Sequence, residues 1–326
     1  MNMTKLASIV GCSPATVSKA FKNSPEISEE TKKKIFDVAK KYNCFTKYYS
    51  PTFGKHVFAV ICNEFSSSVY GSMVESLHKK ILENGDFLLI SCSKFINSNL
   101  DEILDYYINF RNVDGLILID SLGKYIDDSL KRIPTVSINS LYANNIHKCD
   151  FVNIDSSYGF YRAVSHLKEM GHTKIGFIGE YLTLLKLELF KHAMKQCGLV
   201  INESWLITSS KRKSEAGFDA LDKILAQESR PTAIIAAYDA IAFGAINRIY
   251  SAGLKVPDDF SIIGFDNIPL SSFSVPPLST VSTPADELAE VALDLLYKRL
   301  KYKESPFKRV SVQPELIERK SVKKLR

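Results

Sequence analysis

The sequence lacks the features of secreted, membrane-spanning and metal-binding proteins. Its six cysteines are scattered over 326 residues, with no C-x-x-C pair and no cysteine–histidine cluster at zinc-binding spacing. This pattern predicts reduced, apolar thiols rather than a disulfide framework or a metal site. The N-terminus has no apolar signal core, and no apolar run is long enough to cross a bilayer. We therefore expect a soluble, cytoplasmic protein with no membrane partner.

Motifs of common catalytic sites are missing as well. The sequence contains no G-x-x-x-x-G-K-[ST], no G-x-S-x-G, no H-E-x-x-H and no G-x-G-x-x-G after an apolar run. The six histidines form no cluster, and the one in "GH" at 171–172 is expected to close a helix. We therefore expect no enzyme activity, no cofactor and no metal.

Positive charge is concentrated at the start of the chain. Residues 1–56 contain ten lysines and four acidic residues, whereas the remainder has equal numbers of basic and acidic side chains. A basic head on a neutral body predicts a polyanionic partner for the head alone. A solubilising lysine-rich surface is the alternative.

Two segments of the basic head have the apolar periodicity of amphipathic helices. The first ends at Gly11, a residue type that commonly stops a helix. The other begins at Ser28 and has Glu29 and Glu30 in its first turn, where carboxylates stabilise a helix N-terminus. The apolar positions of these two helices are Leu6, Ile9 and Val10, and Ile35, Val38, Ala39 and Tyr42.

A third helical segment lies between these two. Ser13 is suited to cap it and Pro14 to occupy its first position. Val17, Ala20 and Phe21 make one face apolar, as docking on partner helices requires. The remaining positions are small, hydroxyl-bearing or basic: Ala15, Thr16, Ser18, Lys19 and Lys22. These features predict a helix-turn-helix unit whose recognition helix enters a DNA major groove; a purely structural helical bundle is the alternative.

Residues 3–42 resemble the DNA-binding head of the lactose/galactose-repressor (LacI/GalR) family. The resemblance rests on T-V-S at 16–18, A-x-x-x-G-x-S at 7–13 and S-x-x-T at 28–31. It implies that bases are read by the first two recognition-helix residues and the basic residue after T-V-S, and that hydroxyl groups bind phosphates. The DNA-binding candidates are Ser13, Pro14, Ala15, Thr16, Ser18, Lys19, Lys22 and Thr31.

Base recognition should differ from the family pattern in two respects. Lys19 stands where an arginine is usual, so the bidentate geometry of a guanidinium is lost. Pro14 and Ala15 offer no side-chain hydrogen bond, which favours apolar contact such as that with a thymine methyl.

From residue 56 onward, apolar runs alternate with amphipathic helical patterns. Such alternation predicts an α/β fold with parallel sheets covered by helices on both faces. The length of this region favours two doubly wound lobes over one long sheet. The expected strands are 56–62, 87–92, 115–120, 135–139, 151–155, 174–179, 233–239 and 261–266.

This body also resembles the LacI/GalR family over nearly its whole length. The matching segments, in the family's order, are VDGLILI (113–119), IPTVSIN (133–139), HLKEMGHTKIGFIG (166–179), GLKVPDDFSIIGFDN (253–267) and PPLSTV (276–281). The resemblance implies a periplasmic-binding-protein-like core of two lobes, a ligand cleft between them and a dimer interface. The expected domains are a helix-turn-helix head (1–44), a linker (45–56) and a body (57–326) with lobes at about 57–157 and 158–285, the C-terminal part crossing back between them.

Candidate effector-binding residues follow from strand ends and from the resemblance. Ligands of open α/β sheets bind beyond the carboxyl ends of strands, where Asp155, Asp239 and Asp266 are placed. A helix N-cap is the alternative for such an aspartate, and is expected for Asp239 more than for Asp266. The family pattern implies stacking by Tyr70 and Phe273. The full candidate set is Tyr70, Asp155, Lys186, Tyr238, Asp266 and Phe273.

Two of these positions depart from the family. Lys186 stands where an arginine is usual, and Tyr238 where an asparagine is usual. A cleft with fewer polar forks and more aromatic surface predicts an effector with an apolar or flat face, stacked by Tyr70, Tyr238 or Phe273 and oriented by Asp266. A sugar-like effector is the other possibility. A partner-protein co-regulator that binds the outer surface is the alternative.

The linker departs from the family too. Pro51 would interrupt a short helix there, and Gly54 adds freedom. Tyr48, Tyr49 and Phe53 are candidates for wedging bases in the minor groove, with packing onto the body as the alternative.

These features together predict a cytoplasmic, homodimeric transcriptional repressor that binds an inverted repeat in double-stranded DNA and senses a small-molecule effector. A tetramer is not expected, because the tail at 319–326 has no heptads. The alternative is a small-molecule-binding protein or doubly wound enzyme with an unrelated basic head.

Overall fold

The structure is a computed structural model that describes residues 1–22, 24–42, 44–48, 56–111, 113–120, 133–138, 149–302 and 304–325. Two compact units make up the chain: Met1–Phe58 with Ile81–Leu88, and Ala59–Lys80 with Leu89–Arg326. None of the described helices combines the length and apolar character that a bilayer span requires.

Residues 1–48, which we call the head, form helices α1 (Met3–Val10), α2 (Pro14–Phe21), α3 (Glu29–Lys41) and α4 (Phe45–Tyr48). The local signals act as the sequence predicts. Gly11 ends α1 with a φ of 80°, a left-handed conformation that glycine adopts without strain. Ser13 and Ser28 cap α2 and α3 by accepting hydrogen bonds from the third backbone N–H along, at 3.0 and 3.3 Å.

The head has its own apolar core, with two departures from the expected packing. Leu6, Val17, Phe21 and Ile35 are among the buried residues that join α1, α2 and α3. Ile9 and Tyr42, expected on the apolar faces, are 42% and 47% exposed. Their helical spacing is right, but three short helices bury only a narrow stripe of each, and these two positions lie at its edge.

Helix α4 packs on the other helices of the head, although the sequence predicts a linker from residue 45 onward. Phe45 and Tyr48 contact Phe21, with ring centroids 5.8 and 5.9 Å apart. The Tyr48 hydroxyl donates to the carbonyl oxygen of Met1 at 2.6 Å. The head therefore includes Tyr48. The other two minor-groove candidates, Tyr49 and Phe53, lie outside the described residues.

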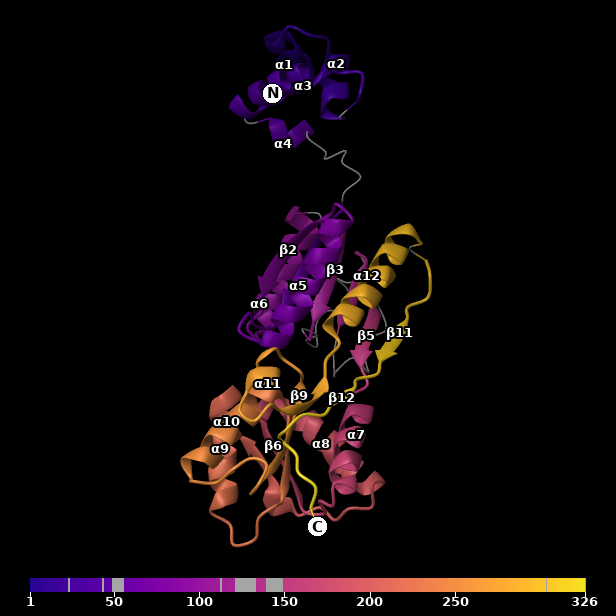
Figure 1. The fold of residues 1–326 in the computed structure, drawn as a ribbon. Helices are drawn as coiled ribbons and strands as arrows, with labels where there is room; N and C mark the ends of the chain where they lie inside the picture. Colours follow the sequence, from indigo (N-terminus) through magenta and orange to yellow (C-terminus); the bar gives the residue numbers. More distant parts are fainter. Residues whose placement is uncertain are drawn as a thin grey trace. The chain divides into compact units, whose positions relative to one another are not determined.

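Two six-stranded sheets organise the rest of the chain (Figure 1). The first has the order β11-β5-β4-β3-β1-β2 and the second β12-β10-β9-β8-β6-β7. The second is parallel except where β12 pairs antiparallel with β10. The first sheet consists of β1 (Val57–Cys62), β2 (Phe87–Cys92), β3 (Gly115–Ile119), β4 (Thr135–Ile138), β5 (Asp150–Ile154) and β11 (Arg309–Val312). The second consists of β6 (Ile175–Glu180), β7 (Leu206–Ser209), β8 (Ala233–Ala236), β9 (Ser261–Asp266), β10 (Ser279–Ser282) and β12 (Leu316–Ile317).

Helices accompany both sheets, and each sheet with its helices forms a lobe. In the C-lobe, built on the second sheet, α7 and α8 lie on one side and α9 and α10 on the other (Figure 1). The N-lobe is built on the first sheet. The helices are α5 (Ser68–Glu83), α6 (Asn97–Asp105), α7 (Ser156–Glu169), α8 (Leu184–Gln196), α9 (Lys213–Leu225), α10 (Asp239–Ser251), α11 (Leu270–Phe273) and α12 (Ala285–Lys301), with a π-helix at Tyr106–Arg111 and 3-10 turns at Tyr181–Thr183 and Glu203–Trp205. This confirms the predicted two-lobed, doubly wound α/β body.

The chain passes between the lobes three times. It leaves β5 for α7, returns after β10 through α12, and crosses again from β11 to β12. Helix α12 packs on β4 and β5, so a segment that follows the C-lobe strands completes the N-lobe.

All eight predicted strands are present, but four further short strands among the described residues were not predicted. The four-residue strands β7, β10 and β11 and the two-residue β12 were not expected. None of them contains a continuous apolar run of four or more residues, and pairing with neighbouring strands rather than local composition makes them strands. The strand expected at 233–239 ends at Ala236, so Asp239 begins α10 instead of closing a strand.

Candidate functional site

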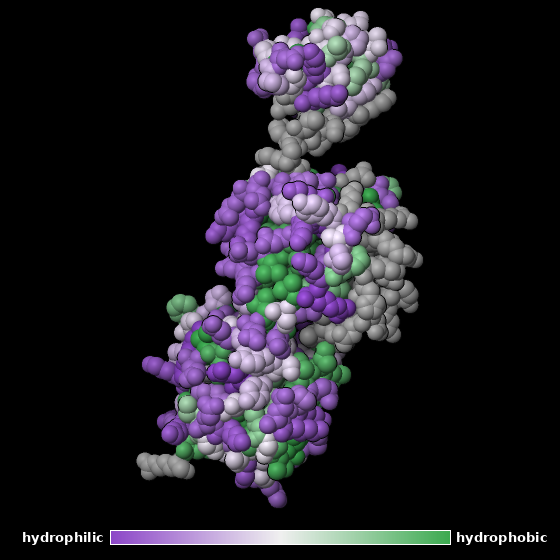
Figure 2. All heavy atoms as spheres, turned by 90° about the vertical axis from the view of Figure 1, so that its right-hand side faces the viewer, coloured by the Kyte–Doolittle hydropathy of each residue, from purple (hydrophilic) through white to green (hydrophobic). Residues whose placement is uncertain are grey.

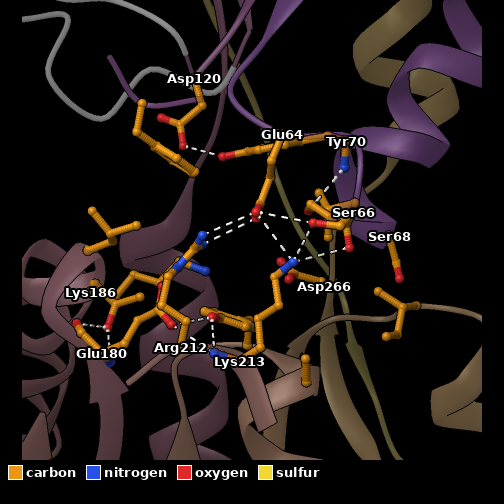
Figure 3. Close-up of a pocket in the computed structure, with 18 residues that line it drawn as sticks. Glu64, Ser66, Ser68, Tyr70, Asp120, Glu180, Lys186, Arg212, Lys213 and Asp266 are labelled. Carbon is orange, nitrogen blue, oxygen red and sulfur yellow. Dashed lines mark hydrogen bonds and ion pairs between the residues drawn. The ribbon is translucent and has the colours of Figure 1, made fainter. Parts of the chain in front are cut away.

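A pocket of about 170 Å³ lies between the two lobes, where strands β1, β3, β6 and β9 reach their carboxyl ends. This is where the topology of open α/β sheets places ligands. Its lining comes from both lobes (Figure 3). The N-lobe contributes Glu64, Ser66, Ser67, Ser68, Val69, Tyr70, Phe95 and Asp120. The C-lobe contributes Glu180, Leu182, Thr183, Lys186, Arg212, Lys213, Tyr238, Ala240, Asp266 and Ile268.

On the N-lobe side, Tyr70 and Asp120 form a buried pair. The Tyr70 hydroxyl donates to Asp120 Oδ2 at 2.7 Å. Burial raises the pKa of Asp120 to about 6, although the Tyr70 hydrogen bond lowers it. The pKa of Tyr70 is raised by burial and by the adjacent Asp120 charge. The raised pKa of Asp120 therefore places its titration in the mildly acidic range, whereas Tyr70 stays a hydroxyl at neutral pH.

On the C-lobe side, Lys186 and Asp266 form a second polar group. The Lys186 ammonium donates to the carbonyl oxygen of Ala237 at 2.9 Å and lies 4.3 Å from the centre of the Phe265 ring. Burial raises the pKa of Asp266 to about 7; the Lys186 charge opposes this rise and the Asp239 charge adds to it. A carboxyl at this pKa can donate or accept a hydrogen bond near neutral pH.

Backbone strain accompanies both carboxyls. Asp266 has a φ of 109° and Asp120 a φ of 50°, values that residues with a Cβ adopt rarely. Such conformations cost about 1–3 kcal/mol each and persist where the surrounding structure enforces them. The two carboxyls are therefore held in place by the backbone of both lobes.

Tyr238 lines the pocket but its hydroxyl is already engaged. It donates to Glu180 Oε2 at 2.7 Å and accepts from the backbone N–H of Lys213 at 3.2 Å. Tyr70 is engaged in the same way through Asp120. The lining is therefore richer in hydrogen-bonded charged groups than the sequence led us to expect.

The N-cap interpretation of Asp239 is wrong, and it is Asp155 that has this role. Asp239 is fully buried and accepts hydrogen bonds from the Ile268 backbone N–H at 3.0 Å and from the hydroxyls of Ser271 and Thr280 at 2.5 and 2.6 Å. Asp155 caps α7 by accepting from the backbone N–H of Tyr158 at 2.9 Å. The Asp239 carboxyl accepts three hydrogen bonds from residues 268–280, so it links α10 to the segments around β10 and is not available for capping.

Of the six predicted effector-binding residues, the structure brings Tyr70, Lys186, Tyr238 and Asp266 together. Asp155 and Phe273 are not among the residues that line the pocket. Phe273 lies on α11 with its side chain 81% exposed. Their expected contact with an effector has no support in this placement.

Sequence reasoning missed several charged residues of the lining. Asp120 and Glu180 come directly after or at the end of apolar strands, so the strand-end rule could have identified them. Glu64, Arg212 and Lys213 lie in or beside loops, and no local pattern marks them.

In the head, the predicted DNA-binding residues lie on or directly beside α2, except Thr31, which lies in the first turn of α3. Ser13, Pro14, Ala15, Lys19 and Lys22 are exposed, whereas Thr16, Ser18 and Thr31 are half-buried. Hydrophilic residues cover much of the head face seen in Figure 2. Lys19 forms an ion pair with Glu26 at 2.5 Å, with side chains 51% and 66% exposed. Exposed pairs contribute little, so a phosphate or base can replace Glu26.

Four hydroxyl groups of the head are held in two hydrogen-bonded pairs. Ser13 and Thr16 share a hydrogen bond of 2.9 Å, and Ser28 and Thr31 one of 2.8 Å. Both pairs lie at helix N-termini, where backbone N–H groups also favour anions. This arrangement can position the head on a DNA backbone.

A helix-turn-helix head joined to a two-lobed body with a pocket between its lobes defines the class of ligand-responsive DNA-binding regulators. Comparison with known proteins is consistent with this class. Residues 164–322 match the model of the periplasmic binding protein-like domain. The chain is 30% identical to the HTH-type transcriptional repressor PurR of Mannheimia succiniciproducens over 98% of both chains. It is 29% identical to the ribose operon repressor of Escherichia coli K12, covering 98% of this chain and 99% of that one. The chain belongs to the LacI/GalR family of transcription regulators.

Solved structures share the fold. The transcriptional regulator CelR in complex with cellobiose is 20% identical, with a TM-score of 0.72 over 98% of this chain and 99% of that one. A LacI family transcriptional regulator from Enterococcus faecium with bound ribose is 22% identical, with a TM-score of 0.72 over 83% of this chain and 100% of that one.

Proposed function

We propose that this LacI/GalR-family regulator is a cytoplasmic, homodimeric repressor. Its affinity for inverted-repeat DNA depends on a small polar effector bound between the lobes. The observation that carries the proposal is the origin of the pocket lining in both lobes. A ligand that contacts both lobes has a higher affinity for the conformation in which the lobes are the right distance apart to contact it together. It can therefore shift the conformational equilibrium of the body.

DNA binding is assigned to the head. Lys19 on the exposed side of α2 reads a base or holds a phosphate, and Pro14 and Ala15 present apolar surface to base edges. Ser13, Thr16, Ser18 and Thr31 hold phosphates with their hydroxyls. Lys22 adds positive charge at the end of the helix. Two heads related by a two-fold axis would read an inverted repeat.

The chemistry of the pocket favours a hydroxyl-rich ligand. The pKa values of Asp120 and Asp266 are raised to about 6 and 7, so their carboxyl groups can accept hydrogen bonds from hydroxyl groups or donate hydrogen bonds to them. The Lys186 ammonium adds a hydrogen-bond donor. A cavity of about 150 Å³ holds one benzene ring, so the volume of about 170 Å³ suits a single sugar-sized ring. Ribose and cellobiose are bound in two of the similar structures, which agrees with this chemistry.

Thermal-shift screening of monosaccharides and purines against the full chain tests the proposal. A true effector should raise the unfolding midpoint of the wild type and have little effect on Asp266→Asn and Tyr70→Ala. Phe273→Ala, which changes an exposed residue outside the lining, is the control and should respond like the wild type. The effector should also change retention of an operator fragment identified by footprinting. Stabilisation that survives both pocket substitutions would place the effector site elsewhere.

A further inference from the structure

A carboxylate of the N-lobe is held by a pair of cations of the C-lobe. Arg212 donates through Nη1 to Glu64 Oε2 at 3.1 Å and through Nη2 to Glu64 Oε1 at 3.2 Å. The Lys213 ammonium lies 3.3 Å from Glu64 Oε2. Figure 3 shows Glu64 at the centre of this group, facing both cations. A guanidinium fork plus an ammonium is the donor set that binds carboxylate or phosphate groups of ligands.

Arg212 is held in place independently of Glu64. Its Nε donates to Glu180 Oε1 at 3.1 Å, and Glu180 has a side chain only 1% exposed. The other oxygen of Glu180 accepts from the Lys213 backbone N–H at 2.9 Å and from the Tyr238 hydroxyl at 2.7 Å. Because Nε of Arg212 is bound to Glu180, the Nη1 and Nη2 atoms of the guanidinium are the ones that face Glu64.

The two cations and the hydrogen-bond partners that position them, Glu180 and Tyr238, belong to the C-lobe, whereas the N-lobe adds the Phe95 ring, whose centroid lies 4.9 Å from the Arg212 guanidinium carbon. Glu180 ends β6, Lys213 begins α9 with Arg212 directly before it, and Tyr238 precedes α10. Glu64 and Ser66, in contrast, lie between β1 and α5 of the N-lobe. Lys213 also donates to Ser66 Oγ at 2.7 Å. Separation of the lobes would remove Glu64 and Ser66 and leave the cation pair assembled.

The charge balance of the C-lobe face favours an anion once Glu64 has left. In the C-lobe part of the lining, Lys186, Arg212 and Lys213 are then opposed by Glu180 and Asp266, while the N-lobe part still contributes Asp120. Asp266 is only partly ionised at neutral pH, since its pKa is raised to about 7. Glu64 is itself an ionised occupant: burial would raise its pKa, but the hydrogen bonds and charges of Arg212 and Lys213 outweigh burial and lower it.

We propose that Arg212 and Lys213 form an anion site in which Glu64 substitutes for the anionic group of the effector. The inference rests on the proposed function and deepens it: the effector carries a carboxylate or phosphate that displaces Glu64 from the two cations. Because the ligand anion and Glu64 repel each other, binding separates Glu64 from Arg212. The anionic effector therefore disfavours the lobe contact that Glu64 makes in its absence.

The test measures the thermal unfolding midpoint of the full chain in titrations with sodium phosphate or sodium acetate, at constant ionic strength set with chloride. We expect a saturable rise for the wild type. Glu64→Gln should saturate at a concentration about tenfold lower, because an internal competitor reduces apparent affinity by the fraction of time it occupies the site. Arg212→Gln should show no saturable rise.

Three further variants make the result specific. Lys211→Gln removes one positive charge from the neighbouring position, where the side chain is 55% exposed and faces Asp219 at 3.8 Å, and should respond like the wild type. Lys213→Gln should weaken the response. Arg212→Lys retains a cation beside Glu180 but loses the fork, so it should show a weaker, still saturable response even if Arg212→Gln folds poorly.

The outcomes separate the possibilities. A stronger response to phosphate than to acetate assigns a phosphorylated effector, and the reverse assigns a carboxylate. Equal responses of Glu64→Gln and Arg212→Gln, or a loss in Lys211→Gln as large as in Arg212→Gln, would overturn the proposal. The anion site would also be overturned if a neutral sugar raised the unfolding midpoint of the wild type through Asp266 while neither phosphate nor acetate did. That result would leave the proposed function intact. An Arg212-dependent anion response with no ligand effect on DNA retention would support the anion site and contradict the proposed function.

Discussion

Arg299 of α12 and Asp150 of β5 form a buried, two-pronged ion pair. Arg299 Nε lies 2.5 Å from Asp150 Oδ2 and Nη2 lies 2.9 Å from Oδ1, with the side chains 7% and 2% exposed. Asp150 Oδ1 also accepts from the Lys308 backbone N–H at 2.7 Å, just before β11. The pair therefore joins the helix and the strand that return from the C-lobe to the sheet of the N-lobe.

Breaking this pair should strongly destabilise the protein. Arg299→Met leaves the Asp150 carboxylate buried without its cation, and the free energy of unfolding should fall by about 3–5 kcal/mol. Urea unfolding measures the change. The control is Lys80→Met, which breaks the more exposed pair with Glu290 (29% and 64% exposed) and should cost less than about 1 kcal/mol. Similar losses in the two variants would contradict the structural role of the buried pair.

Lys19→Ala should weaken specific DNA binding by roughly 1–3 kcal/mol and relax sequence preference at one position per half-site, because a base contact is lost. Electrophoretic mobility shifts on a set of operator variants measure both effects. Lys33→Ala, which removes an exposed lysine of α3, is the charge-matched control. Equal weakening on every sequence would make Lys19 a phosphate contact.

The stability of the body should depend on pH through Asp266. In the folded protein its pKa is raised to about 7, whereas an unfolded aspartate titrates at about 3.9. Between about pH 3.9 and about pH 7, the folded state binds more protons at this carboxyl than the unfolded state does. The contribution of Asp266 to the free energy of unfolding is therefore greatest at the acidic end of this range and falls as the pH rises, by at most about 1.4 kcal/mol per pH unit. Asp120, with its pKa raised to about 6, acts in the same direction.

Asp266→Asn should remove this contribution. The urea midpoint of the wild type should therefore fall more than that of Asp266→Asn between pH 5 and pH 8. Parallel profiles for the two proteins over that range would show that Asp266 titrates normally.

The assembly in solution should be a two-fold symmetric dimer, because two heads on a dimeric body are needed to read an inverted repeat. Analytical ultracentrifugation at micromolar concentration, with and without an operator fragment, measures the mass of the species. A monomer in both conditions would count against the proposed mode of DNA binding.

Local signals in the sequence were sufficient for the first three helices of the head and for eight of the strands described in the two sheets. Ser13, Ser28 and Gly11 act on backbone groups within four residues, so helix ends could be predicted from neighbours alone. The long apolar strands of both lobes were predictable because burial on both faces of a parallel sheet demands continuous apolar runs. The order of the family segments also indicated the two-lobed body.

Only the tertiary structure decided how the lobes are completed and which charges meet in the pocket. Glu64 and Arg212 are 148 positions apart, and Asp150 and Arg299 are 149 apart. No periodicity or cap links such residues, because their proximity depends on the path of the chain between the lobes. The same holds for Asp239, whose three donors come from residues 29 to 41 positions away. The sequence determined which elements form, whereas long-range packing determined the partners of the charged side chains, since burying a charge is tolerated only where the fold supplies its counterpart.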